Sequence, residues 1–130
     1  MSAVRNLALQ TFGVLYQDAE RVAEYEDRHL AVQAAATLGT RIDMAFMVMT
    51  YLRDRQPLRE SLSGELREDA LEVAAHLLEG CVEKLNIATE RHRGDQLLMR
   101  VLASSRRLLS SARAGQISYA PANGKGVAHP

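Results

Sequence analysis

The sequence is poor in cysteine, in aromatic residues and in net charge. Its one cysteine, Cys81, excludes an internal disulfide and a zinc site built from cysteines, and such sparse cysteine indicates a reducing compartment. Tryptophan is absent, and aromatic residues make up 5% of the chain. No apolar run approaches the roughly 18 residues of a membrane span, and residues 1–6 lack the basic region and apolar block of a signal peptide. We therefore expect a cytoplasmic protein without membrane insertion.

The sequence does contain enough apolar surface for one soluble domain. Its 130 residues are 47% apolar and 25% charged, and a compact chain of this length buries about two-thirds of the surface that its unfolded form exposes. The 16 basic and 16 acidic residues cancel in number, but residues 61–90 hold 2 basic and 7 acidic groups and residues 91–130 hold 7 and 1. The two segments could attract each other or present opposite faces to a partner.

Apolar residues recur at the helical spacing of three and four along most of the chain. The first stripe covers residues 7–38 and is interrupted by a charged stretch at 24–29, so it predicts one long helix over about residues 3–38 with a kink in that stretch. A second stripe ends before Pro57, whose ring clashes with the preceding helical turn. Gly39 lies between the stripes and either ends the first helix or is tolerated inside a longer one.

Residues 56–64 form the best-defined loop of the sequence, because proline, serine and glycine cluster there. Helical spacing resumes over residues 63–88, with acidic residues in the first turns, where the helix dipole favours negative charge. It is interrupted again by a polar stretch around Gly94 and returns from Leu98 onward. Glycine costs a helix about 1 kcal/mol relative to alanine, so Gly94 is expected to bend the chain or to separate two helices.

No segment shows the strict alternation or the β-branched enrichment of a strand. The predicted fold class is therefore all-α, either an elongated helical hairpin or a three- to four-helix bundle. We expect one helical domain over residues 1–113. Residues 114–130 contain three glycines and two prolines but little apolar surface, and they are predicted to form a flexible, disordered tail.

Two motifs that contain histidine are candidates for chemistry. Glu26 and His29 have the Glu-x-x-His spacing of di-iron bundles, but such sites need a second copy and two further carboxylates. The chain has no second copy, so we expect a solvated face and no metal. Residues 75–81 read Ala-His-Leu-Leu-Glu-Gly-Cys and resemble the histidine phosphotransfer motif His-x-Leu-Lys-Gly, with His76 as the phosphate carrier. Glu79 stands in place of the lysine, and its carboxylate would repel a phosphoryl group. Phosphotransfer through His76 is therefore an alternative prediction.

Cysteine and methionine are further candidates, either for reactivity or for binding. Cys81 lies on the apolar stripe of its helix, which predicts a buried structural thiol rather than a nucleophile. Methionines 44, 47 and 49 are spread around their helix. Met49 fits the core, whereas Met44 and Met47 either pack into the core or form an adaptable surface for an apolar partner.

The last third of the chain is rich in arginine, and it could meet phosphate groups through the following side chains: Arg91, Arg93, Arg100, Arg106, Arg107 and Arg113. No aromatic residue precedes Tyr119 in this segment, so the stacking platform that single-stranded nucleic acids require is missing. What remains is electrostatic binding of nucleic acid, which is a second alternative. The competing interpretation is a solvated helix face that balances the acidic segment before it.

Apolar residues are most crowded in the last predicted helix, at Leu97, Leu98, Met99, Val101, Leu102, Leu108 and Leu109. Consecutive residues lie about 100° apart around a helix axis, so adjacent leucines widen the apolar face beyond one narrow stripe. Such a helix is either central in a bundle or binds a partner. With about three helices to cover it, we expect a partner helix to pack there. Ile117 and Tyr119 are isolated apolar residues in the polar tail, as is typical of short docking segments.

Several features near the C-terminal end occur together. A polar turn, Glu-Arg-His-Arg at 90–93, precedes an arginine-bearing helix that begins with Leu97–Leu98 and ends with Leu108–Leu109. The tail then reads Ile-Ser-Tyr-Ala-Pro-Ala-Asn-Gly-Lys from Ile117. This arrangement resembles the FlgN family of flagellar export chaperones. Members of that family have long N-terminal helices, an amphipathic C-terminal helix that binds hook–filament junction proteins, and a tail that contains a tyrosine.

The resemblance implies a cytoplasmic type III export chaperone without catalysis and without a cofactor. Such a protein would bind an apolar helical segment of a hook-associated client and deliver it to the export apparatus, with Tyr119 docking on the export gate. The expected partner-binding residues are Leu97, Leu98, Val101, Leu102, Leu108, Leu109, Ile117 and Tyr119. The sequence is compatible with a monomer or with a homo-oligomer, and it does not identify the client.

Overall fold

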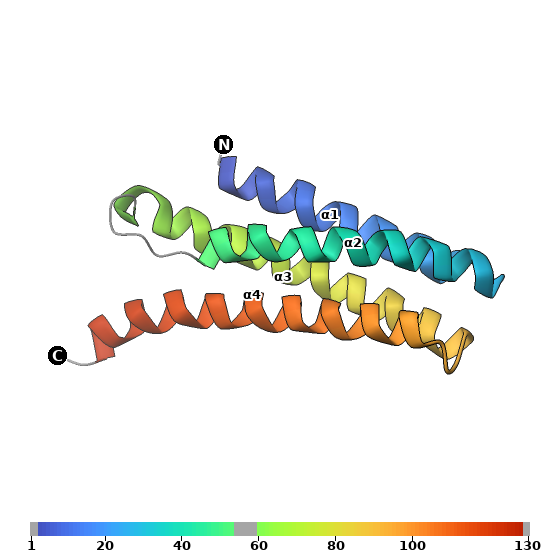
Figure 1. Ribbon diagram of the computed structural model, residues 1–130. Coiled ribbons are helices and arrows are strands. Elements are labelled where there is room, and N and C mark those ends of the chain that lie inside the picture. The colour runs from blue at the N-terminus through green and yellow to red at the C-terminus, as the bar shows by residue number, and fades with distance from the viewer. Residues whose placement is uncertain (1–2, 54–59, 129–130) are drawn as a thin grey trace.

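The computed structural model describes the backbone of residues 3–53 and 60–128 and the side chains of residues 3–53 and 67–116. This part of the chain forms four helices and no strand (Figure 1). The helices are α1 (Ala3–Glu24), α2 (Arg28–Arg53), α3 (Glu60–Arg91) and α4 (Gln96–Ala128). The architecture confirms the all-α prediction and selects the four-helix bundle among its alternatives. No helix in the described ranges combines the length and the apolar character needed to cross a membrane.

The four helices occupy the corners of a bundle. α1 packs against α2 and α3, and α4 packs against the same two helices, whereas α2 and α3 touch at few points and lie diagonally opposite each other. Consecutive helices run in opposite directions, so α1 is parallel to α3 and α2 is parallel to α4 (Figure 1). Each helix therefore has two close neighbours and buries an arc of its surface rather than a single narrow line.

A short loop separates the first two helices, so the prediction of one helix over residues 3–38 is wrong. Residues 25–27 leave the helical path, and Asp27 caps α2, because its Oδ1 accepts a hydrogen bond from the backbone N–H of Leu30 at 3.1 Å. Aspartate is a strong N-cap, since it satisfies a backbone donor that the start of a helix leaves unpaired. The charged stretch therefore begins a new helix, and Gly39 is accommodated inside α2.

The turn between α3 and α4 follows the same scheme and confirms that Gly94 separates two helices. Gly94 has a φ of +85°, a left-handed conformation that residues with a Cβ rarely adopt. Asp95 then caps α4, because its Oδ1 accepts a hydrogen bond from the backbone N–H of Leu98 at 3.0 Å. One glycine and one aspartate thus end one helix and start the next within a few residues.

The two turns lie at the same end of the bundle and hold each other. Arg28 Nε lies 3.2 Å from Asp95 Oδ2, and His92 Nε2 lies 3.1 Å from the carbonyl oxygen of Tyr25. Arg91 also donates to the Tyr25 carbonyl, at 3.2 Å. The pKa of Asp95 is below its ordinary value, because the Leu98 amide donates to its carboxylate and because Arg28 both donates to it and attracts it.

The core is one cluster to which all four helices contribute. Its largest fully buried side chains are Phe12, Leu15, Val22, Leu38, Ile42, Met49, Leu52, Leu71, Leu78, Leu85, Leu98 and Leu108. Between these large residues the buried positions are mostly alanines, which allow helix backbones to approach closely. The expectation that Met49 packs in the core is confirmed.

α4 continues past residue 113, where the sequence analysis places the end of the helical domain. Gly115 is buried, and a Cβ on it would lie 2.9 Å from Leu71 Cδ1 and 3.1 Å from Arg53 Cγ. The close approach shows that α4 still packs against α3 and α2 at this position. The backbone remains helical to Ala128. Side chains of residues 117–130 lie outside the described part of the chain, so the disorder expected for the tail stays a prediction.

Candidate functional site

The leucine-rich segment of α4 belongs to the core, and the prediction of an apolar surplus at its surface is wrong. At most 8% of each of the following residues is exposed: Leu98, Val101, Leu102, Leu108 and Leu109. Leu97 is partly buried against the same core. These six residues therefore stabilise the bundle and present no continuous face to a client helix.

The wide apolar face of α4 has a structural explanation in the number of its neighbours. α4 packs against both α2 and α3, so adjacent leucines such as Leu108 and Leu109 are both covered although they lie about 100° apart around the axis. Ser105, fully buried on the same helix, adds a polar contact of 3.6 Å to Cys81 Sγ on α3. Two of the other three helices, α2 and α3, are therefore enough to cover the wide apolar face of α4.

Two further residues expected to bind a partner, Ile117 and Tyr119, lie on the helical backbone of α4. Their side chains lie outside the described part of the chain. The structure therefore does not bring them together with the leucines of α4 into one described surface. Docking of Tyr119 on an export gate stays a prediction.

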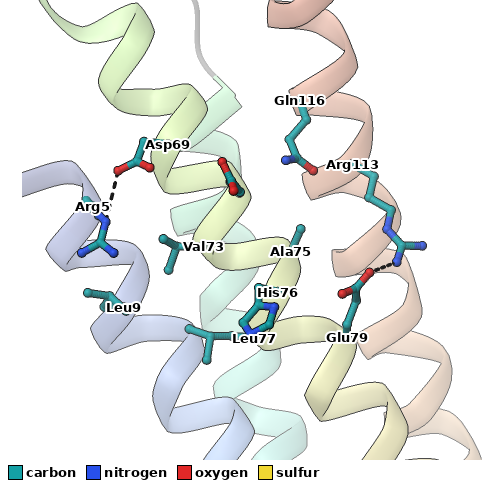
Figure 2. A pocket seen from close by; sticks show the side chains of 11 residues that line it. Arg5, Leu9, Asp69, Val73, Ala75, His76, Leu77, Glu79, Arg113 and Gln116 are labelled. Atoms are coloured by element: carbon teal, nitrogen blue, oxygen red, sulfur yellow. Dashed lines mark hydrogen bonds and ion pairs between the residues drawn. The ribbon is translucent and has the colours of Figure 1, made fainter.

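His76 is exposed on α3 and lines a shallow groove of about 500 Å³ that runs over α3 from α1 to α4 (Figure 2). Ion pairs flank the histidine on both sides: Arg5 Nε lies 3.1 Å from Asp69 Oδ2, and Arg113 on α4 pairs with Glu79. Among the described residues that line this groove, both arginines are therefore already matched by carboxylates. A phosphoryl group on His76 would have to compete with these carboxylates for its cations.

Gly80, the glycine of the phosphotransfer-like motif, has a packing role. A Cβ on Gly80 would lie 2.6 Å from Cε1 and 2.8 Å from Cδ1 of Tyr16, so the absence of a side chain lets the tyrosine ring of α1 lie directly against α3. In the phosphotransfer family the corresponding glycine makes room for a docking receiver domain. Here the space above Gly80 is filled by the ring of Tyr16, which weakens the motif interpretation.

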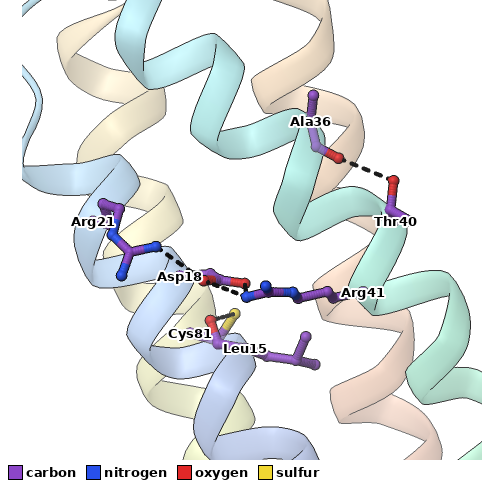
Figure 3. A network of polar contacts seen from close by, with 7 residues as sticks. All are labelled: Leu15, Asp18, Arg21, Ala36, Thr40, Arg41 and Cys81. Atoms are coloured by element: carbon purple, nitrogen blue, oxygen red, sulfur yellow. Dashed lines mark hydrogen bonds and ion pairs between the residues drawn. The ribbon is translucent and has the colours of Figure 1, made fainter.

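Cys81 is a buried thiol, as the apolar stripe indicates. It is 0% exposed, and its Sγ lies 3.8 Å from the carbonyl oxygen of Leu15 (Figure 3). Burial raises the pKa of Cys81 to about 11, a hydrogen bond with Ser105 opposes this change, and the charge of Asp18 adds to it. The thiol is therefore protonated at neutral pH and is a poor nucleophile.

Asp18 is the most buried carboxylate of the described side chains, and two arginines hold it in place. Its side chain is 5% exposed, and Arg41 NH1 on α2 lies 2.8 Å from Oδ2, while Arg21 NH1 lies 3.5 Å from Oδ1 (Figure 3). The contact between Asp18 and Arg41 fixes the register of α1 against α2. The Asp18 carboxylate is buried and both arginines are paired with it, so we interpret this cluster as structural.

Glu26 and His29 do not form a metal site. Glu26 lies in the loop and His29 in the first turn of α2, so the two side chains do not share one helix face as the spacing of a di-iron motif requires. Both residues are exposed. Within the described side chains, no group of three or more histidine, cysteine, aspartate or glutamate residues could hold a metal ion.

The arginines of the C-terminal third are mostly engaged with the protein itself. Arg113 pairs with Glu79, Arg93 pairs with Glu90 and Arg91 binds backbone carbonyls. Arg106 donates to the side-chain oxygen of Asn86 on α3 at 3.1 Å. The ion pair between Arg113 and Glu79 joins the basic and acidic segments across the α3–α4 contact, which fits one of the two arrangements that the charge distribution predicts. Of the remaining two, Arg100 lines a groove between α2 and α4, and Arg107 donates to Ser104 on its own helix.

The most exposed apolar side chains lie on α2. Met44 and Met47 are 65% and 76% exposed, and Tyr51 on the same helix is 45% exposed. The spacing of three and four residues places these side chains on one face of α2. That face is opposite the one that buries Ile42 and Met49. The structure thus supports the alternative in which Met44 and Met47 are on the surface.

α1 extends this apolar face. α1 and α2 are antiparallel, and Asp18 contacts Arg41. Val14 lies one turn before Asp18, and Met44 lies one turn after Arg41, so the two apolar residues are level with each other across the α1–α2 groove. Val14 is 39% exposed. We name Val14, Met44, Met47 and Tyr51 the methionine face.

Tyr51 is held at one end of the methionine face. The guanidinium carbon of Arg67 on α3 lies 5.1 Å from the centroid of its ring, a distance typical of a cation–π contact. Met44 and Met47 are more exposed than Tyr51, and their unbranched side chains adapt to different partners. Sequence reasoning identified Met44 and Met47 but missed Tyr51 and Val14. The spacing of Met44, Met47 and Tyr51 could have identified Tyr51, whereas Val14 is recognised only once α1 is placed beside α2.

Comparison with protein-family models, with curated proteins and with solved structures finds no match to this chain. The resemblance to the FlgN family therefore stays a prediction.

Proposed function

We propose that this protein is a non-catalytic cytoplasmic adaptor or chaperone that binds an apolar helical segment of another protein on the methionine face. The observation that carries the proposal is the exposure of Met44 and Met47, at 65% and 76%, on a helix whose opposite face is fully packed. Two exposed methionines on successive turns add nothing to the stability of a monomer whose core is already filled. They would, however, provide apolar contacts for a bound helix. Tyr51 supplies a rigid aromatic anchor beside them.

An amphipathic helix suits this face because both surfaces repeat with the same period. Met44, Met47 and Tyr51 follow one another at three and four residues, and a client helix with apolar residues at the same spacing would interdigitate with them. The outer positions that precede Met44 on α2 are the smaller Thr40 and Ala36, both exposed. A helix lying along α2 can therefore approach closely over this part of the helix.

A flagellar type III export chaperone is the particular form of this proposal, and the sequence resemblance to the FlgN family supports it. In this form the client is a hook–filament junction protein, and the chaperone delivers it to the export apparatus. The client-binding surface differs from the one expected from the sequence, because the leucines of α4 are buried and the methionine face is available. As the resemblance implies, the proposal also includes docking of Tyr119 on an export gate.

The test compares two charged variants. In the first, Met44→Asp is combined with Met47→Asp, and in the control Met99→Asp introduces the same side chain at an exposed methionine outside the methionine face. Each is co-expressed with the hook–filament junction proteins of the same genome and purified by a tag on this chain. We expect the wild type and the control to retain a junction protein and the double variant to lose it while its circular dichroism stays helical. Equal retention by the double variant would contradict the proposed surface.

The two alternatives have less structural support. Phosphotransfer through His76 predicts acid-labile phosphate on this residue after incubation with a phosphorylated receiver domain, but Tyr16 occupies the space next to Gly80 that a receiver would need. Electrostatic nucleic-acid binding predicts an affinity that falls steeply with salt, but Arg106 and Arg113 of α4 already have partners on α3.

A further inference from the structure

Two arginines of α4, Arg100 and Arg107, are seven residues apart and therefore on one face of that helix. Arg100 lines the groove of about 260 Å³ between α2 and α4, together with Thr40 and Asp43. Arg107 donates to Ser104 Oγ at 3.0 Å, and Ser104 lines the same groove. Both arginines are exposed, and neither forms an ion pair with a carboxylate in the described part of the chain.

The register of the two parallel helices places these arginines along a helix that would lie on α2. A Cβ on Gly39 would lie 3.4 Å from Val101 Cγ2, so Gly39 and Val101 are level. Six residues further along each helix, Arg107 is level with the turn of α2 that carries Met44 and Met47. Arg100, seven residues earlier on α4, lies about 10.5 Å away along the helix axis.

The opposite edge of the methionine face, along α1, also carries two arginines, but both are in ion pairs. Arg21 and Arg41 both contact Asp18, so the two cations on this side share one carboxylate within the protein. Among the described side chains that line the α2–α4 groove, Arg100 and Asp43 are the charged ones. Arg107 lies about two turns further along α4, hydrogen-bonded to Ser104. The two edges therefore differ in ion pairing: both arginines on the α1 side pair with a carboxylate, whereas in the described part of the chain neither Arg100 nor Arg107 on the α4 side does so.

We propose that the helix bound on the methionine face carries acidic side chains along the edge that lies next to α4, at positions seven residues apart that match Arg100 and Arg107. The inference rests on the proposed function and specifies the chemistry of the client. Apolar contacts with Met44 and Met47 supply most of the affinity, while the two arginines select acidic over basic helices and align the bound helix.

The experiment uses the full chain with ¹³C-labelled methionine methyl groups and two synthetic helices of about 18 residues, five turns long. The peptides are stapled on their outer face so that both are helical before binding. They share one apolar stripe, and its edges carry glutamate in the first peptide and lysine in the second. Met49, which is 1% exposed, and Met99 on α4, which is 54% exposed, serve as internal references for the signals of Met44 and Met47.

We expect the glutamate peptide to shift the Met44 and Met47 signals and to bind about tenfold more tightly than the lysine peptide at low salt, since two attractive pairs replace two repulsive ones. Arg107→Glu should reduce this preference, and Arg107→Glu combined with Arg100→Glu should reverse it. The matched control is Arg106→Glu, which makes the same change at the adjacent residue. Arg106 points towards Asn86 on α3, so this variant should keep the preference.

The outcomes separate the two proposals. If both peptides shift Met44 and Met47 with equal affinity, or if Arg106→Glu alters the preference as much as Arg107→Glu does, the acidic-edge inference is wrong and the methionine face remains a helix-binding surface. If neither peptide shifts these signals at millimolar concentration, the proposed function itself is overturned, and the inference fails with it.

Discussion

Truncation of Leu98 measures whether the leucines of α4 hold the bundle together. Leu98 is 0% exposed, whereas the next residue, Met99, is 54% exposed. Leu98→Ala removes three carbon atoms, which at about 0.8 kcal/mol each accounts for about 2.4 kcal/mol of transfer free energy. The cavity left in the core adds to this value, so we expect the free energy of unfolding to fall by about 3 to 4 kcal/mol. Met99→Ala removes a half-exposed side chain and should change it by less than about 0.5 kcal/mol.

The assay is urea unfolding followed by circular dichroism at 222 nm, with thermal unfolding as a second readout. For a domain of this size about 1 kcal/mol corresponds to about 3 °C, so Leu98→Ala should lower Tm by about 10 °C and Met99→Ala should leave it nearly unchanged. Equal stability of Leu98→Ala and the wild type would refute the burial argument. It would also return the α4 leucines to the list of candidate client contacts.

Three further predictions follow from single contacts. Gly80→Ala should lower the free energy of unfolding in urea by about 1 to 2 kcal/mol, because its Cβ would lie 2.6 Å from Tyr16. Gly13→Ala should raise it by up to about 1 kcal/mol, because its Cβ would meet nothing within 4 Å. A change of the same sign in both variants would contradict the packing role of Gly80. The lowered pKa of Asp95 means that its carboxylate stabilises the fold above its ordinary pKa of 3.8 and that this stabilisation is lost as the pH falls through the lowered value. Asp95→Asn should therefore flatten the acid limb of stability plotted against pH, and an unchanged limb would disprove the assignment. Cys81, with a pKa raised to about 11, should resist iodoacetamide at pH 8 in the native protein and react in urea, and rapid native labelling would show that the thiol is accessible.

The fold class and most of the core could be predicted from the sequence, because helical periodicity directly reports which residues face inward. Phe12, Leu15, Ile42, Met49 and Leu85 all lie on apolar stripes and are all buried. The break at Gly94 was predictable as well, since a glycine in a polar stretch is a poor helix residue. These features depend on local spacing, which the sequence contains in full.

The boundary between the first two helices was harder to predict. Charged residues interrupt the stripe at the start of α2, and a charged interruption is compatible both with a kink and with a new helix. The capping bond from the Leu30 amide to Asp27 decides between them. Aspartate at a helix start is a known signal, but the pattern of apolar residues continues on both sides of Asp27 and favoured one long helix.

The candidate site could be predicted only in part, because exposure depends on how many neighbours a helix has. The sequence predicts the wide apolar face of α4. Whether Leu98 and Leu109 are exposed depends on the positions of α2 and α3, which cover this face from two sides. For Met44 and Met47 the sequence left two alternatives open, and the position of α2 at a corner of the bundle exposes them. The arginines beside this face belong to another helix, far away in the sequence, and required the register of α2 against α4.

The most direct measurement of the central claim places a photo-cross-linking amino acid at one of two exposed methionines. Met47 lies on the methionine face, and Met99 lies on α4 outside it. After irradiation of the complex with a bound junction protein, the account predicts a covalent adduct from position 47 and none from position 99. An adduct from position 99 without one from position 47 would show that the partner binds α4 and would contradict the account.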